Sequence, residues 1–160
     1  MNYSSNISTM SNSNAKSATV QALETFLDAT FALYFAAHHH HWNVQGSQFI
    51  TLHALFEAEY RDAFEALDEI AERIRMLNSP VRNMQTLPSV EASFHAKDAD
   101  TLALEMVTHL VELHQQAMVA SQEVLNAASR DNDSVTEDLA VGRLAIHSKQ
   151  VWMLNSLLAK

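Results

Sequence analysis

The sequence predicts an all-α protein built as a four-helix bundle, and three observations support this fold class. The 160 residues include only two glycines and two prolines, which argues for long helices and few turns. Apolar residues recur at steps of three and four along four long segments. The length suits one domain with a sizeable core. We therefore expect the bundle over residues 18–160, preceded by an arm of residues 1–17.

The arm is expected to be disordered. Residues 1–17 are rich in serine and asparagine and offer little that a core would bury. Lys16 is their single basic residue.

The first two helices are expected over Thr19 to about Val44 and over Ser47 to Asn78. Gly46 separates them, the Ser47 hydroxyl can cap the second helix, and Pro80 lies just beyond its end. The first buried stripe is Val20, Leu23, Leu27, Phe31, Tyr34 and Ala37. The second is Phe49, Leu52, Phe56, Ala63, Phe64, Leu67, Ile70 and Ile74.

A long connection, residues 79–98, links the second and third helices and is expected to contain a short helix over residues 89–94. The third helix runs from about Asp98 to Ser129, with Leu102, Met106, Leu110, Leu113, Ala117, Ala120 and Val124 on its buried side. After a turn at residues 131–134, the fourth continues to Leu158. Its expected stripe is Leu139, Ile146, Met153 and Leu157, with Gly142 at a close helix approach. A long crossover between two helical hairpins is the connectivity of ferritin-like bundles.

Composition narrows the classes of function. The formal charge of −9 argues against a general nucleic-acid surface, which needs clustered lysine and arginine. This charge suits a protein that gathers cations, or it simply keeps an oligomer soluble. The absence of cysteine excludes disulfides and thiolate ligands and fits a reducing compartment. Without a membrane-span run or a signal-peptide pattern, we expect a soluble cytoplasmic protein.

Five residues have the side chains and spacing of a metal site: His41, His53, Glu57, Asp68 and Glu72. The last four fall within an arc of roughly 100° on the second predicted helix. However, His53 and Glu57 lie roughly 22 Å along the axis from Asp68 and Glu72, too far to share one ion. A second, antiparallel copy related by a two-fold axis near Asp62 would close the distance. We therefore expect the site between two subunits, twice per interface.

Imidazole and carboxylate ligands without sulfur favour iron, manganese or zinc. The run His41-Trp42-Asn43-Val44-Gln45-Gly46, followed by Phe49, His53, Asp68, Glu72 and Arg73, resembles the signature of the Dps family. These mini-ferritins are named as DNA-binding proteins from starved cells. The likeness covers about residues 19–158, including the crossover helix and the ending Asp138…Trp152-Met153-Leu154.

The resemblance implies a hollow homo-dodecamer with di-iron ferroxidase centres at its two-fold interfaces and ferric mineral inside. By motif position, His41 and His53 are the nitrogen ligands, and Asp68 and Glu72 are the partner's carboxylates. Glu57 is the acid on the histidine side, where the family usually has aspartate, so it either binds the second iron directly or shifts the pair. Hydrogen peroxide is the implied oxidant, because a two-electron acceptor meeting two Fe²⁺ releases no hydroxyl radical.

Several neighbours carry weaker expectations. Trp42 serves as an electron donor or as a packed wall, and His38 could support His41 from three residues away. His39 and His40 are expected at the surface or an interface. The resemblance places a pore that admits Fe²⁺ near Asp133, Glu137 and Asp138, with Asp138 the best candidate, although acids here also complement a helix dipole.

The leading interpretation is a ferroxidase and iron store that uses Fe²⁺ and hydrogen peroxide. The first alternative is a DNA-binding protein that protects the nucleoid with little ferroxidase turnover. Because the arm offers only Lys16, little counterion release is available, and DNA binding is not expected at physiological salt. The second alternative is a bundle whose metal site is structural, or holds zinc or manganese without turnover.

Overall fold

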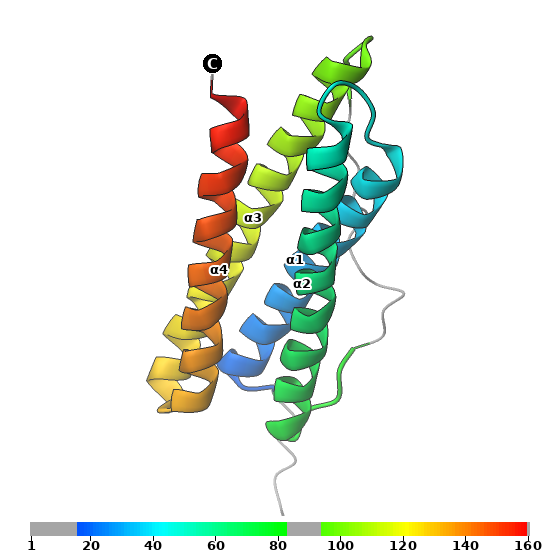
Figure 1. Cartoon of the computed structure of the whole chain (residues 1–160). Helices are drawn as coiled ribbons and strands as arrows, with labels where there is room; N and C mark the ends of the chain where they lie inside the picture. Colours follow the sequence, from blue (N-terminus) through cyan, green and yellow to red (C-terminus); the bar gives the residue numbers. More distant parts are fainter. Residues whose placement is uncertain (1–15, 83–93, 160) are drawn as a thin grey trace, which may run out of the picture.

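The computed structural model describes residues 16–82 and 94–159, and all their regular secondary structure is helical (Figure 1). The helices are α1 (Ala18–Asn43), α2 (Phe49–Met76), α3 (Ala99–Asp131) and α4 (Ser134–Leu158). The predicted all-α bundle is confirmed, with each helix end within a few residues of its expected place. The predicted short helix over residues 89–94 falls almost entirely outside the described residues, as do residues 1–15 of the arm.

Side-chain caps begin three of the four helices. Ser17, Asp98 and Asp133 each accept a hydrogen bond from the backbone N–H three residues ahead. The expected cap on α2 is wrong: Gln48 occupies the N-cap position without a side-chain bond. Ser47 instead donates its backbone N–H to the Asp100 carboxylate, at 2.5 Å.

Gly46 makes the turn between α1 and α2 possible. Its φ of 101° lies in the region that favours glycine, and a Cβ at this position would collide with the Asp100 carboxylate. This turn folds α2 back along α1, so residues from the end of α1 face residues from the start of α2.

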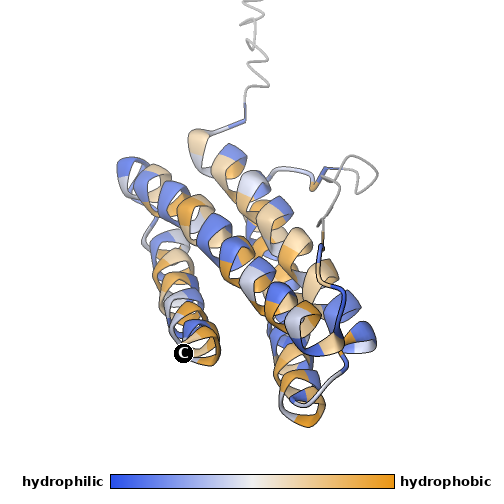
Figure 2. Ribbon diagram, turned by 90° about the horizontal axis from the view of Figure 1, so that it is seen from above, coloured by the Kyte–Doolittle hydropathy of each residue, from blue (hydrophilic) through white to orange (hydrophobic). Residues whose placement is uncertain are grey.

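The helices pack as two hairpins. α1 packs on α2, α3 packs on α4, and α1 also packs on α3 (Figure 1). Each helix carries both apolar and polar residues, as expected of amphipathic helices in a bundle (Figure 2). One apolar cluster surrounds Leu33, Phe56 and Leu110, and a second surrounds Leu27 and Ile70. No helix among the described residues is long and apolar enough to cross a membrane.

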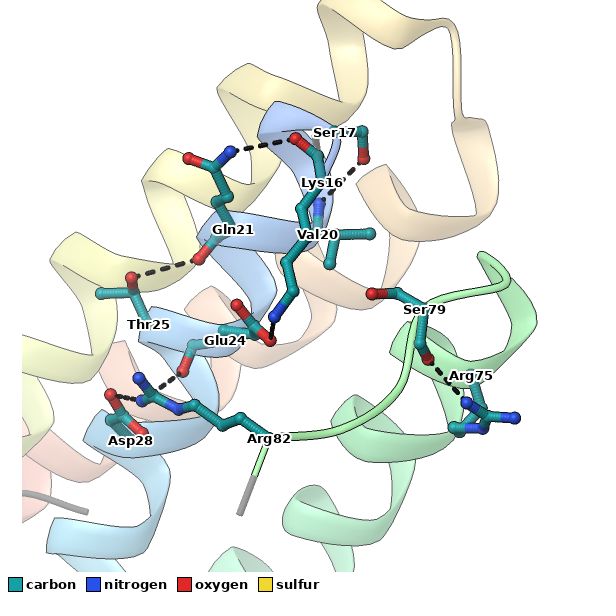
Figure 3. Close-up of polar contacts among 10 residues, drawn as sticks. All are labelled: Lys16, Ser17, Val20, Gln21, Glu24, Thr25, Asp28, Arg75, Ser79 and Arg82. Carbon is teal, nitrogen blue, oxygen red and sulfur yellow. Dashed lines mark hydrogen bonds and ion pairs between the residues drawn. The ribbon is translucent and has the colours of Figure 1, made fainter. Parts of the chain in front are cut away.

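The chain that leaves α2 returns beside the start of α1 (Figure 3). Arg82 forms an ion pair with Asp28, and Lys16 forms one with Glu24. Arg75 donates to the Ser79 carbonyl at 3.0 Å, which supports the end of α2.

On α2, six of the eight residues predicted to be buried are buried, and the exceptions are Phe49 and Phe64, which are 39% and 61% exposed. On α4, the predicted stripe is only half-buried, and the buried residues are Thr136, Ala140, Arg143, His147 and Leu154. Among residues 16–82 and 94–159, no atom beyond Gly142's own neighbours and helix backbone lies within 4 Å of a Cβ built on it, so no described helix approaches there.

His40 also differs from expectation, because it is buried rather than at the surface. Its Nε2 atom lies 3.0 Å from Nδ1 of His109, and its ring packs edge-on against Phe94. His39 is exposed, as expected.

Candidate metal centre

The centre of the candidate site is a stacked pair of histidines, His41 at the end of α1 and His53 near the start of α2. Their ring centroids are 3.8 Å apart. The Nδ1 atom of each ring lies 2.9 Å from the backbone carbonyl oxygen of the other residue. Because a carbonyl oxygen can only accept, both Nδ1 atoms carry the proton. Because Nδ1 is engaged in each ring, Nε2 is the nitrogen that can bind a metal ion.

Glu57 lies one helical turn after His53 and is held by Arg61. The guanidinium donates twice to Oε1 of Glu57, at 2.9 and 2.7 Å. The Arg61 hydrogen bond lowers the pKa of Glu57, partial burial opposes this effect, and the charges of Arg61, His41 and His53 add to the lowering. Glu57 is therefore an anion at neutral pH, close enough to both histidines to feel their charge.

Asp68 and Glu72 lie further along α2, both exposed, and this chain does not bring them to the histidine pair. Within residues 16–82 and 94–159, no three His, Cys, Asp or Glu side chains gather so as to hold a metal ion. The separation of roughly 22 Å expected from the rise of an α-helix accounts for this arrangement. In one chain, Asp68 and Glu72 therefore lie apart from the histidine pair.

Aromatic rings surround the histidine pair. His38 lies between Tyr60 and Trp42, with ring centroids 4.1 Å from each. Tyr60 lies 5.3 Å from His41, whereas His38 lies 6.3 Å from it. Burial and the charge of His41 lower the pKa of His38, which favours its neutral form.

Trp42 is 67% exposed, so in one chain it does not close the site. Tyr60 is a neighbour of the site that the sequence did not predict. Its position seven residues after His53, two helical turns along the same face, was the available signal.

Arg73, directly after Glu72, ties this end of α2 to the start of α4. Its guanidinium donates to both carboxylate oxygens of Asp133, at 2.6 and 2.8 Å, and to the Thr136 hydroxyl at 2.7 Å. Burial raises the pKa of Asp133, but the bonds from Arg73 and Thr136 outweigh burial and lower it to about 2. Asp133 is thus engaged in capping and ion pairing, whereas Asp138 is exposed and Glu137 half-buried.

Substituting Asp133 with alanine is expected to lower the free energy of unfolding by about 1 to 2 kcal/mol, the usual value of a helix cap. The folded-state pKa is depressed, so the stabilisation is complete above the ordinary aspartate pKa and declines as the pH falls toward 2. Denaturant unfolding at pH 7 and pH 3 measures this difference. An equal loss at both pH values would contradict the assignment.

An acidic groove of about 610 Å³ runs between α2 and α4. Its walls include Glu65, Glu69, Glu72 and Asp138. Its two arginines, Arg73 and Arg143, are each paired with an aspartate, so the remaining carboxylates leave it negatively charged. The groove therefore connects the candidate ligand Glu72 with the candidate pore residue Asp138.

Known proteins share this architecture over most of the chain. The Ferritin-like domain model matches residues 20–160. The DNA protection during starvation protein 2 of Bacillus anthracis is 32% identical over 127 residues, 79% of this chain and 86% of that protein. The DNA protection during starvation protein of Helicobacter pylori is 29% identical over 149 residues, 88% of this chain and 99% of that protein.

Solved structures agree with these relatives. Dps from Staphylococcus aureus superposes with a TM-score of 0.79 at 27% identity, covering 89% of this chain and 95% of that one. Dps from Vibrio cholerae O1, described as one of the ferritin-like diiron-carboxylate proteins, gives a TM-score of 0.77 at 28% identity, covering 88% and 89%. Sequence, fold and family model lead to one conclusion: the chain belongs to the Dps family of ferritin-like proteins.

Proposed function

We propose that this protein is a ferroxidase and iron store. It binds Fe²⁺ between two subunits, oxidises it preferentially with hydrogen peroxide, and keeps the ferric product inside a hollow homo-dodecamer. The observation that carries the proposal is the stacked His41/His53 pair, in which both Nδ1 atoms are committed to backbone carbonyls. Membership of a family that includes ferritin-like diiron-carboxylate proteins supports iron as the substrate.

The ligand set suits the oxidation of iron. His41 and His53 of one subunit bind Fe²⁺ through Nε2, and Asp68 and Glu72 of the other supply oxygen ligands. Carboxylates prefer the harder Fe³⁺ ion, so the site favours loss of an electron. Two Fe²⁺, one hydrogen peroxide and two protons give two Fe³⁺ and two water molecules. Each iron loses one electron, and no hydroxyl radical is released.

Glu57 is the proposed ligand on the histidine side for the second iron. Both bonds from Arg61 fall on the same oxygen, Oε1. Exposed ion pairs between residues four apart contribute little to stability, so iron displaces Arg61 at small cost.

Replacing Arg61 with alanine is therefore expected to change the rate of Fe²⁺ oxidation less than about threefold. Replacing Glu57 with alanine should reduce the number of irons bound per site. Anaerobic Fe²⁺ titration and stopped-flow oxidation of both variants measure these two effects. A tenfold or greater loss in Arg61→Ala would show that the guanidinium itself takes part in the reaction.

We propose that Fe²⁺ reaches the site through the acidic groove, after passing a pore near Asp138 and Glu137. The groove carries Glu69 and Glu72 on α2 and Asp138 on α4. The alternative for Glu137 is local, because an acid in the first turn also stabilises its own helix. Asp133, whose carboxylate is held by Arg73 and Thr136, is the weakest of the three pore candidates.

Protection of DNA, which the names of the relatives describe, follows here from removing Fe²⁺ and peroxide. Direct DNA binding is the alternative. The chain carries a formal charge of −9, and Lys16 forms an ion pair with Glu24. A small counterion-release contribution is therefore expected. Tight gel-shift binding at neutral pH and physiological salt would favour the DNA-binding alternative.

The proposal is tested by adding hydrogen peroxide to the anaerobic Fe²⁺-loaded protein. We expect two Fe²⁺ oxidised per peroxide, faster than with dioxygen, and no hydroxyl radical detected by a spin trap. If the protein instead binds metal without accelerating oxidation, and removing the metal melts the assembly, the site is structural.

A further inference from the structure

Polar side chains bridge α2 and α4 on one side of the bundle. α2 packs chiefly on α1, and α4 packs chiefly on α3, so these two helices meet across the acidic groove. Three groups of side chains bridge the groove, and we call them together the α2/α4 seam. They are Arg73 with Asp133 and Thr136, Asp62 with Arg143, and Glu59 with His114 and His147.

The inward face of α4 depends on these bridges to an unusual degree. Its buried residues are Thr136, Ala140, Arg143, His147 and Leu154, of which only Ala140 and Leu154 are apolar. A helix in a bundle is normally held by a continuous apolar stripe. In the middle of α4, Arg143 and His147 take the place of that stripe, so hydrogen bonding contributes much of what holds this helix against α2.

The deepest bridge is a chain of three buried side chains from three helices. Oε2 of Glu59 on α2 lies 2.5 Å from Nε2 of His114 on α3. Nδ1 of His114 lies 2.9 Å from Nδ1 of His147 on α4. All three residues are at most 2% exposed. Nε2 of His147 has no hydrogen-bond partner among the residues that the structure describes.

The surroundings of His147 oppose a positive charge on its ring. Phe26 of α1 packs edge-on against the ring, and His114 approaches from α3. The nearby carboxylates of α2 are already paired, Glu59 with His114 and Asp62 with Arg143. A proton on His147 would thus add a cation one turn from Arg143 and leave a buried N–H without an acceptor. Burial, Arg143 and His114 together lower the pKa of His147 to about 3.

We propose that His147 is an acid-sensitive latch, whose protonation separates α4 from α2 along the seam while the rest of the bundle stays folded. Opening exposes the imidazole to water, where it has its ordinary pKa of about 6.5. The open form then binds a proton that the closed form does not, so its population rises about tenfold per pH unit below 6.5. This inference goes beyond the proposed iron chemistry and does not depend on it.

Amide hydrogen exchange read by mass spectrometry tests the latch on the full-length, metal-free assembly. With labelling times matched for intrinsic exchange, opening of peptides from residues 134–158 should increase about 100-fold between pH 7.5 and pH 4.5. Peptides from α2, whose buried residues include no histidine, should keep their protection. His147→Gln, which cannot titrate, should lose the response, and His39→Gln, the same change at an exposed position, should retain it.

Three results would overturn the latch: constant protection of α4, equal loss of protection in all helices, or an unchanged acid response in His147→Gln. If His147→Gln fails to assemble, the pH dependence of the wild-type protein alone provides the test. The logarithm of its α4 opening constant should change with a slope near one between pH 6 and pH 4.5. A slope of zero, or an equal slope in α2, contradicts the proposal.

Discussion

Replacing His53 with alanine is expected to slow Fe²⁺ oxidation about 100-fold. The substitution removes one of the two nitrogen ligands and also the ring whose Nδ1 donates to the His41 carbonyl. Loss of groups that merely orient metal ligands costs tenfold to 100-fold, so loss of a ligand should lie at or beyond the upper end of that range. The initial rate of ferric absorbance after mixing Fe²⁺ with peroxide measures the effect.

His39→Ala is the matched control, because it removes an exposed imidazole two residues before His41. It should oxidise iron at the wild-type rate. Gel filtration of both variants separates a chemical defect from a failure to assemble. A wild-type rate in correctly assembled His53→Ala would exclude His53 as a ligand.

Replacing His114 with leucine is expected to reduce the free energy of unfolding by about 3 to 5 kcal/mol, because it leaves the buried Glu59 carboxylate without its hydrogen-bond partner. Glu59 is 2% exposed, and His114 is its hydrogen-bond partner. The double variant Glu59→Leu/His114→Leu removes the stranded carboxylate and should recover most of the loss. Guanidinium unfolding at one fixed protein concentration measures these values, because assembly contributes to stability.

Glu123, an exposed glutamate on the same helix as His114, provides the reference for the His114→Leu prediction. Glu123→Leu should change stability by less than about 0.5 kcal/mol, as exposed substitutions usually do. The pairing of Glu59 with His114 would be refuted by a double variant as unstable as the sum of the two single variants, because independent sites add.

Local sequence signals were enough to predict the four helices. Gly46, which was predicted to separate the first two helices, adopts the positive φ that its turn needs, whereas the caps at Ser17 and Asp98 were not predicted. The buried face of α4 could not be predicted in this way. The partners that bury Arg143 and His147 belong to α2 and α3, distant in sequence, so helical periodicity contains no sign of them.

The candidate site could also be predicted only in part. Spacing along one helix predicted which ligand-type residues share a face, and it predicted that one chain cannot close the site. Spacing could not predict the reciprocal bonds between the His41 and His53 rings and backbone carbonyls, because they depend on how the Gly46 turn stacks two helices. The chain from Glu59 to His147 joins three helices, so no local motif indicates it.

The central claim, that each site takes histidines from one subunit and acids from another, is tested most directly by mixing two inactive variants. His41→Ala/His53→Ala and Asp68→Ala/Glu72→Ala are co-expressed in equal amounts, and the ferroxidase rate of the mixed assembly is measured. In random mixing, half of the two-fold interfaces are mixed, and each of these contains one intact site and one site that lacks both histidines and both acids. The account predicts about a quarter of the wild-type rate, whereas no recovery in a fully assembled mixture would contradict it.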